Sequence, residues 1–202
     1  MVKAAVLVSG GGTNLQAILD AEDAGKIRSA RVSLVVSNNP DAYALTRAKN
    51  RGVETLVLSK ADYPTRAQFE QALTEALRAR GIGLIVLAGF MRILSADFTK
   101  QYPERILNVH PALIPSFCGE GYYGLRVHEA ALEYGVKVTG ATVHFVNEIP
   151  DGGRIIAQKA VYIEDGDTPE TLQKRVMREA EWILLPEAIE KVSAQINCAC
   201  GA

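Results

Sequence analysis

The sequence predicts an α/β fold, in which a doubly wound, mostly parallel sheet is followed by an antiparallel hairpin and a final helix. Short apolar segments alternate with amphipathic segments through the first half of the chain, as in successive βαβ units. Strands that are apolar throughout are typical of a parallel sheet covered on both faces. Two segments of alternating polarity then flank a turn at 150–153, which indicates the hairpin. The fold class is therefore Rossmann-like, and we expect one domain over 1–202 with a flexible tail from about 192.

The elements of the first half follow from local composition. Strands rich in Val, Ile and Leu are expected at 3–8, 31–36, 54–58, 84–87 and 105–109. Helices are expected between them at 14–24, 41–51 and 65–80. Gly25, Gly52 and Gly81 follow these helices directly, and glycine commonly ends a helix because it adopts the left-handed conformation.

The second half predicts a different arrangement. The hairpin strands are expected at 137–147 and 154–163. A last helix should begin near Thr168 and should kink or break at Pro186, because proline lacks the N–H that continues the helical hydrogen bonds.

Composition narrows the functional classes. The chain has 202 residues, of which 48% are hydrophobic and 22% charged, as in an ordinary globular domain. A net charge of −1 and a pI near 6.3 offer no basic field for nucleic acid. No apolar run approaches a membrane span, and a strand pattern starts at the N-terminus, so we expect a cytoplasmic protein. Cys118, Cys198 and Cys200 are expected to be reduced thiols, and no metal site is predicted.

A glycine-rich loop, Ser9-Gly-Gly-Gly-Thr-Asn14, joins the first strand to the first helix. Glycines let the backbone approach a ligand, and free amides at a helix N-terminus favour phosphate. The dinucleotide version of this loop is disfavoured, because Leu15 replaces its third glycine and no carboxylate ends the second strand. The loop thus predicts a phosphate site, although a turn that needs glycine only for packing is the alternative.

The segment Asn108-Val-His-Pro-Ala-Leu-Ile-Pro-Ser-Phe117 ends the fifth strand. Asn108 and His110 lie on the same side of an extended chain, so an amide donor and a proton-exchanging imidazole can face one carbonyl. Taken alone, the segment is explained more simply by a histidine satisfied within a proline-rich turn.

Two further parts of the sequence are expected near Asn108 and His110: the segment 87–94 and Asp151. Leu87-Ala-Gly-Phe-Met-Arg-Ile-Leu94 offers an apolar wall that suits a flat heteroaromatic ligand, with core packing as the alternative. If the first, fourth and fifth strands are neighbours, the three strand ends line one crevice. Asp151 can approach His110 and raise its pKa, or it can simply serve the hairpin turn. His144 should face the sheet or the pocket, and His128 should be solvated.

Together with Thr139-Gly-Ala-Thr-Val-His-Phe-Val146, these motifs closely resemble the phosphoribosylglycinamide formyltransferase family from residue 2 to about 191. The resemblance implies the formyltransferase fold and transfer of a formyl group from 10-formyltetrahydrofolate to the amine of glycinamide ribonucleotide, in purine synthesis. It implies that the phosphoribosyl end is held by Gly12, Thr13 and Asn14. It also implies that the folate is flanked by Arg66, Met91, Arg92, Ile93 and Leu94, with Asn108. Asn108, His110 and Asp151 would be the catalytic residues.

The implied mechanism matches the physical interpretation. The amine attacks the formyl carbon, and Asn108 and a protonated His110 stabilise the oxyanion of a tetrahedral intermediate. Asp151 keeps His110 protonated and helps the amine proton reach the departing nitrogen, without a covalent enzyme intermediate.

Three departures from the family pattern are visible. The connection from Cys118 to Gly124 is longer than the family's usual one and could reshape a lid over the site. The family's ribose-binding Glu aligns with Glu181 when counted back from Pro186, but with Ala180 when counted forward from Arg175; we choose Glu181. Arg154 stands where a proline is common.

Other functions share some of these features. Formyltetrahydrofolate hydrolase uses similar catalytic residues but carries an extra N-terminal domain, and the methionyl-tRNA and sugar formyltransferases usually need further C-terminal sequence. A noncatalytic nucleotide or folate binding module would not need all three catalytic residues. A homodimer is left open, and the small-molecule substrates are the only other expected partners.

Overall fold

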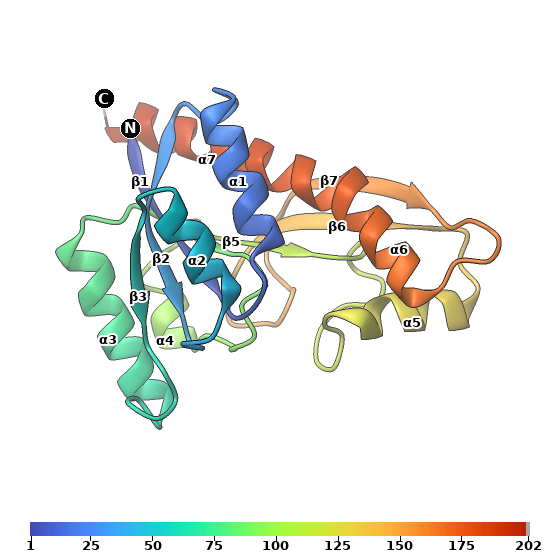
Figure 1. Cartoon of the computed structure of the whole chain (residues 1–202), viewed down its shortest axis with the longest axis horizontal. Coiled ribbons are helices and arrows are strands. Elements are labelled where there is room, and N and C mark those ends of the chain that lie inside the picture. Colours follow the sequence, from blue (N-terminus) through green and yellow to red (C-terminus); the bar gives the residue numbers. More distant parts are fainter. Residues whose placement is uncertain (201–202) are drawn as a thin grey trace.

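A computed structural model describes residues 1–200, without the side chain of Cys200. All seven strands form one sheet in the order β3-β2-β1-β4-β5-β6-β7 (Figure 1). The strands are β1 (Val2–Val8), β2 (Ala30–Ser37), β3 (Glu54–Val57), β4 (Leu84–Leu87), β5 (Ile106–His110), β6 (Val138–Phe145) and β7 (Ile155–Tyr162). The first five are parallel, and β6 and β7 are antiparallel. The predicted doubly wound sheet with a C-terminal hairpin is confirmed.

The predicted helices are present with small changes at their ends. The helices are α1 (Thr13–Asp23), α2 (Tyr43–Asn50), α3 (Arg66–Ala79), α4 (Ala96–Thr99), α5 (Leu125–Tyr134), α6 (Pro169–Val176) and α7 (Trp182–Cys200), with a π-helical turn, η1 (Met177–Glu181), between the last two. Among the described residues, no helix is both long enough and apolar enough to cross a membrane.

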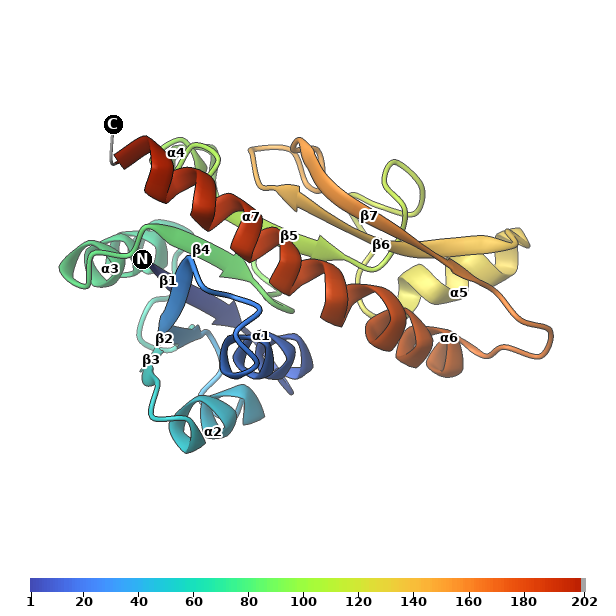
Figure 2. The ribbon, with the colours of Figure 1, turned by 90° about the horizontal axis from the view of Figure 1, so that it is seen from above.

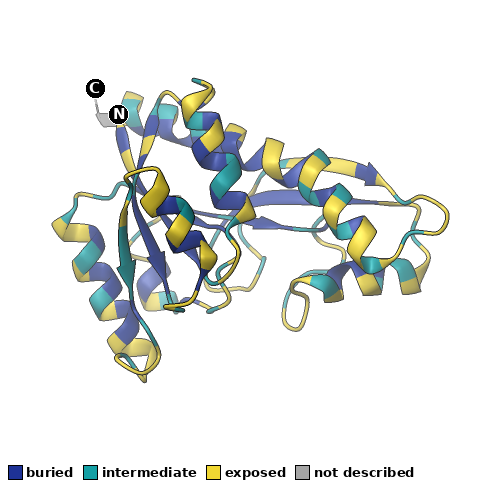
Figure 3. Cartoon of the chain, in the orientation of Figure 1, coloured by how far each residue is buried: buried dark blue, intermediate teal, exposed yellow. Residues whose placement is uncertain are grey.

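Helices cover the two faces of the sheet, so two apolar clusters form (Figures 2 and 3). One cluster packs α1, α2 and α7 against one face, and the other packs α3 and α4 against the opposite face. Alternate residues of β1 divide between them, with Val6 in the first cluster and Leu7 in the second. This burial on both faces explains why the central strands are apolar throughout.

The expected neighbours β1, β4 and β5 are adjacent, so the loops after their carboxyl ends meet at one edge of the sheet. Strand β6 then pairs antiparallel with β5 and places His144 opposite Asn108. The connection between β6 and β7 includes Asp151 and reaches the same edge, where Asp151 lies beside His110 at the end of β5. The topology therefore brings the sequence motifs together.

The expected tail is wrong over 192–200, because α7 continues to Cys200. Val192 and Ile196 are buried one helical turn apart in the cluster under α7, and the amide of Asn197 donates to the Ser29 carbonyl. This spacing fixes the last turns of α7 to the domain. Residues 201–202 of the expected tail lie outside the described residues.

The last helix was expected to kink or break at Pro186, and it does not break there. Pro186 lies inside α7, and the irregular turn is η1, which ends just before Trp182. The missing N–H of Pro186 would have bonded to the Trp182 carbonyl, so the lost bond falls where the regular ladder is already interrupted. The irregularity is thus displaced toward the N-terminal side of the proline.

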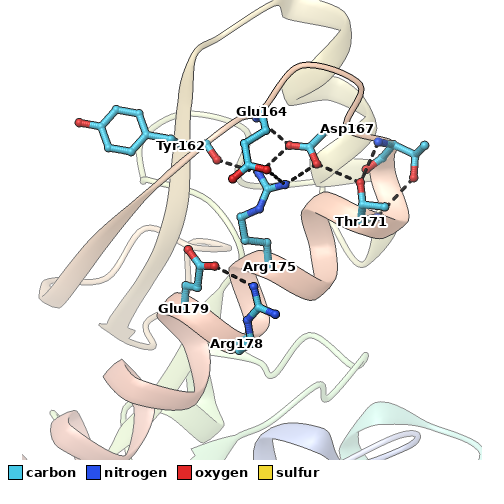
Figure 4. Close-up of polar contacts among 8 residues, drawn as sticks. Tyr162, Glu164, Asp167, Thr171, Arg175, Arg178 and Glu179 are labelled. Carbon is cyan, nitrogen blue, oxygen red and sulfur yellow. Dashed lines mark hydrogen bonds and ion pairs between the residues drawn. The ribbon is translucent and has the colours of Figure 1, made fainter.

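An ion-pair network anchors the start of α6 (Figure 4). The guanidinium of Arg175 makes two 2.7 Å contacts with the Asp167 carboxylate and donates to the Tyr162 carbonyl at 3.0 Å. The Asp167 side chain is only 3% exposed, and bidentate pairing suits the fork of arginine. This network ties α6 to the end of β7.

Gly12 is needed where the glycine loop meets α2. Its φ is +73°, and a Cβ built on it would lie 2.6 Å from the Cβ of Ala44. We therefore expect Gly12→Val to lower the free energy of unfolding by about 2–4 kcal/mol, through backbone strain and overpacking. Urea unfolding measures the loss. Gly10→Ala is the control, because nothing lies within 4 Å of its built Cβ; equal losses in the two variants would contradict this explanation.

Candidate active site

A cavity of about 990 Å³ opens at the carboxyl ends of β1, β4 and β5. The glycine loop, the segment after β4, the end of β5 and the turn before β7 all contribute to its wall. The predicted site residues that line it are Gly12, Thr13, Asn14, Met91, Arg92, Ile93, Leu94, Asn108, His110, Asp151 and Glu181. Arg66 is not among the lining residues and is exposed at the start of α3. One cavity therefore gathers every predicted site residue except Arg66.

Four polar side chains meet at the centre of the cavity. Asp151 Oδ2 lies 3.5 Å from His110 Nδ1, and Asp151 Oδ1 lies 3.5 Å from both Asn108 Nδ2 and His144 Nε2. Asn108 Nδ2 is also 3.2 Å from His144 Nε2. Because β5 pairs with β6, the strand register itself sets the Asn108–His144 contact. His144 was expected to face the sheet or the pocket, and it lines the pocket.

The ring of His110 has a fixed orientation. Its Nε2 lies 2.7 Å from the Phe117 carbonyl, which can only accept, so Nε2 carries a hydrogen. The neutral ring then has its lone pair at Nδ1, beside Asp151. His110 Nδ1 is thus the nitrogen that can take up or release a proton.

The expectation that Asp151 gives His110 a raised pKa is wrong as a net effect. Burial lowers the pKa of His110 below its ordinary value, although the Asp151 charge and the Phe117 carbonyl act in the opposite direction. His110 is only 4% exposed, so the loss of hydration of the imidazolium outweighs these attractions. The resting ring is therefore neutral at neutral pH.

Asp151 is ionised in this setting. Burial alone would raise its pKa, but contacts with His144, the nearby His110 and the Gly119 N–H together hold the pKa of Asp151 below its ordinary value. The Gly119 N–H donates to Oδ2 at 2.9 Å. Asp151 has a φ of +55°, an unusual backbone conformation for a residue other than glycine. The turn holds a carboxylate toward the two histidines.

His128 was expected to be solvated, and this is wrong. It is 0% exposed on α5 and lines the cavity, and neither ring nitrogen has a hydrogen-bond partner. Burial and the nearby His110 lower the pKa of His128 to about 4. The buried neighbours Val127 and Ala131 were the available sequence signal, because they mark the inner face of the helix.

The glycine loop leaves backbone open to the cavity. Gly12 caps α1 with no side-chain hydrogen bond to the first amides, while Gly10 and Gly11 have open space where a Cβ would stand. Uncapped amides at a helix N-terminus and exposed glycine backbone suit an anion. Packing explains Gly12, whereas Gly10 and Gly11 leave open space beside their backbone.

Glu181 faces the cavity beside this loop. Its Oε2 accepts from Asn14 Nδ2 at 2.7 Å, and burial raises the pKa of Glu181 to about 7. Ala180 is not among the cavity-lining residues. The two counts that gave Ala180 or Glu181 differ by one residue, and a π-helical turn accommodates one extra residue within a helix. The structure therefore favours Glu181 as the residue that can meet a ligand.

The apolar wall is divided between cavity and core. Met91 and Ile93 are 57% and 61% exposed, whereas Leu94 is only 5% exposed and belongs to the cluster under α3. The guanidinium of Arg92 lies 4.2 Å from the centre of the Phe69 ring. Met91 and Ile93 are the side chains free to cover a flat ligand.

The long connection before α5 closes one side of the cavity. Its residues from Gly119 to Gly124 all line the cavity, and its Gly119 amide contacts Asp151. Gln173 and Met177 also line the cavity, and sequence analysis did not assign them to the site. The described residues contain no group of three or more His, Cys, Asp or Glu side chains placed to hold a metal ion.

Comparisons with known proteins agree with this geometry. The formyl transferase family model matches residues 2–189, so the chain belongs to the formyl transferase family. The chain is 41% identical over 190 residues to the phosphoribosylglycinamide formyltransferase of Haemophilus influenzae. This match covers 94% of this chain and 86% of that protein. It is also 45% identical over 193 residues to the chicken trifunctional purine biosynthetic protein adenosine-3, covering 96% of this chain.

The chain spans only 18% of the length of that chicken protein. Among solved structures, glycinamide ribonucleotide transformylase 1 from Symbiobacterium toebii matches with a TM-score of 0.90 and 46% identity, covering 96% of this chain and 89% of the other. The fold is thus that of the solved glycinamide ribonucleotide transformylase.

The buried Glu181 carboxyl should make stability depend on pH. Its folded pKa of about 7 exceeds the ordinary 4.5, so the folded state keeps a proton that the unfolded chain loses. The contribution of Glu181 to the free energy of unfolding should fall by on the order of 3 kcal/mol as pH rises from about 4.5 to about 7, then level off. His128 contributes with the opposite sign between about pH 4 and 6.5, because its folded pKa lies below the ordinary value, so the effect of Glu181 is the difference between the variant and the native chain. Urea unfolding of Glu181→Gln should show this fall removed. Glu179→Gln, on the same π turn, is the control and should keep it; a native pH dependence in Glu181→Gln would contradict the prediction.

Proposed function

We propose that this protein transfers the formyl group of 10-formyltetrahydrofolate to the amine of glycinamide ribonucleotide, a step of purine synthesis. The observation that carries the proposal is the convergence of Asn108, His110 and Asp151 between an anion-binding loop and an exposed apolar wall in one cavity. Family membership and the similarity to phosphoribosylglycinamide formyltransferases support the same reaction.

The cavity suits both substrates. Its volume of about 990 Å³ is at the upper end of the usual range for small-molecule sites. The free amides of the glycine loop would bind the phosphate, and Glu181 would accept from ribose hydroxyls at the adjoining wall. Met91 and Ile93 would cover the pterin ring of the folate. The amine would then attack the formyl carbon that 10-formyltetrahydrofolate supplies.

The polar centre would then manage charge and protons. Asn108 directs one N–H at His144 and the other, in a longer contact of 3.5 Å, at Asp151 Oδ1. The N–H of this longer contact would turn to the oxyanion that develops on the formyl oxygen. Neutral His110 accepts the amine proton at Nδ1, and the resulting imidazolium is stabilised by the Asp151 carboxylate. His110 next gives this proton to the departing nitrogen, so no covalent intermediate with the protein forms.

The direct test incubates the protein with 10-formyltetrahydrofolate, with and without glycinamide ribonucleotide, and follows the release of tetrahydrofolate. We expect release only when the nucleotide is present, with an equal amount of formylated nucleotide. Release without the amine would identify a hydrolase instead. No release in either reaction would leave a binding module, and the transferase proposal would be wrong.

We also propose a cytoplasmic location and a function without nucleic acid. The net charge of −1 supports the second point, because binding to a phosphate backbone needs an excess of basic residues. A homodimer stays a prediction that sedimentation equilibrium can test.

A further inference from the structure

The carbonyl of Phe117 makes the shortest contact of His110. It lies 2.7 Å from Nε2, whereas the Asp151 carboxylate lies 3.5 Å from Nδ1. Since the carbonyl cannot donate, this contact selects the neutral tautomer with hydrogen on Nε2. Without it, Nε2 and Nδ1 could exchange roles, and the lone pair could turn away from Asp151.

Phe117 holds an unusual backbone conformation. Its φ is +48°, a left-handed value that residues other than glycine rarely adopt. The chain is held just before and just after it, because the Ser116 N–H donates to the Leu113 carbonyl and the Gly119 N–H, two residues on, donates to Asp151. The same short turn therefore gives an acceptor to His110 and a donor to Asp151.

The ring of Phe117 is the anchor on this turn. It makes edge contacts with Tyr122 at 6.3 Å and with Tyr134 at 6.0 Å between ring centres. Edge-to-face arrangements at these separations are attractive. Tyr122 belongs to the long connection and Tyr134 ends α5, so the two rings hold Phe117 from two elements.

We propose that Phe117 is a positioning residue for the reaction: its anchored ring fixes its carbonyl on His110 Nε2, which makes Nδ1 the nitrogen that exchanges protons. The proposal rests on the proposed formyl transfer for its kinetic consequence, but its structural consequence concerns the free protein. A phenylalanine that merely fills space would leave the tautomer of His110 unchanged on removal.

The structural test measures the tautomer by ¹⁵N NMR of imidazole-labelled protein without substrates. The chain has three histidines, so a His110→Asn sample assigns the resonances. In the native chain, neutral His110 should carry its hydrogen on Nε2. In Phe117→Ala the signals should shift toward a mixture of both tautomers, whereas Phe117→Tyr, which keeps the ring, should retain the native pattern. A native pattern in Phe117→Ala would overturn the proposal.

The kinetic test uses the same variants. Phe117→Ala should lower kcat by up to about 100-fold through misplacement of the ring, with an unchanged KM for the nucleotide, and Phe117→Tyr should restore kcat. The acidic limb of the pH profile should move to lower pH, because the Phe117 carbonyl raises the pKa of His110. Equal losses in kcat and nucleotide affinity would point to general disruption and would contradict the positioning role.

A milder variant keeps the proposal testable if Phe117→Ala does not fold. Tyr134 is 80% exposed and does not line the cavity, so Tyr134→Ala removes one anchor without touching the site. It should change the tautomer ratio in the same direction but less; no change in a folded Tyr134→Ala together with an unfolded Phe117→Ala would also overturn the proposal. If the native chain transfers no formyl group, the proposed function is wrong, while the NMR result still decides the role of Phe117.

Discussion

Replacement of His110 by alanine is expected to lower kcat by about 10²–10⁴-fold, the usual contribution of a positioned general acid or base. The variant lacks the ring nitrogen that lies 3.5 Å from Asp151 Oδ2, so the amine proton loses its acceptor on that side of the carboxylate. Binding of the nucleotide should change little, because the glycine loop and Glu181 form the other end of the cavity. Steady-state kinetics and calorimetry of nucleotide binding measure the two effects.

Ser116→Ala is a matched control for this experiment. Ser116 is exposed in the same proline-rich segment, and it does not line the cavity. It should keep native kcat. Near-native turnover in His110→Ala would remove His110 from the mechanism, and a large loss in Ser116→Ala would show that the segment, not the imidazole, is sensitive.

Replacement of Asp151 by asparagine should have the second large effect. Asparagine keeps the size of the side chain but removes the charge that stabilises the imidazolium, so kcat should fall by about 10²–10³-fold. Loss of the Asp151 charge should lower the pKa of His110 further, because that charge raises it in the native chain. If neutral His110 is the base, the acidic limb of the profile of kcat/KM against pH must move to lower pH.

Glu148→Gln is the control for the loss of charge. Glu148 lies exposed in the same turn and does not contribute to the cavity wall. An unshifted pH profile in Asp151→Asn would mean that the limb reports another group, and the proposed proton path would then need a different base.

The order of elements was readable from local sequence. Short apolar runs such as 84–87, bounded by turn residues, are typical of buried strands, and glycines such as Gly25 mark where helices stop. The strand order then followed from the rules for doubly wound sheets, so Asn108 and the glycine loop were expected at one crevice. The strands and helices themselves depend on residues close together in the chain, and their order in the sheet follows from general rules of topology.

The errors concern burial, which depends on distant residues. His128 was expected to be solvated, yet it is enclosed by the cavity wall. The pKa of His110 was expected to rise because a carboxylate was nearby, but the loss of hydration is larger and only the packed structure sets it. The last turns of α7 were expected to be flexible. They are held by the contact of Asn197 with Ser29, and residues so far apart in the sequence give no local sign of such a contact.

The sequence by itself determined the sheet, its helices and the strand ends where Asn108, His110 and the glycine loop meet, because periodicity and turn chemistry act over a few residues. Tertiary structure alone decided which nitrogen of His110 faces Asp151, since a backbone carbonyl at Phe117 has no signature in the residue type. It also decided that Glu181 rather than Ala180 enters the cavity, because a π turn holds one residue more than a regular turn and residue types alone do not reveal where it forms.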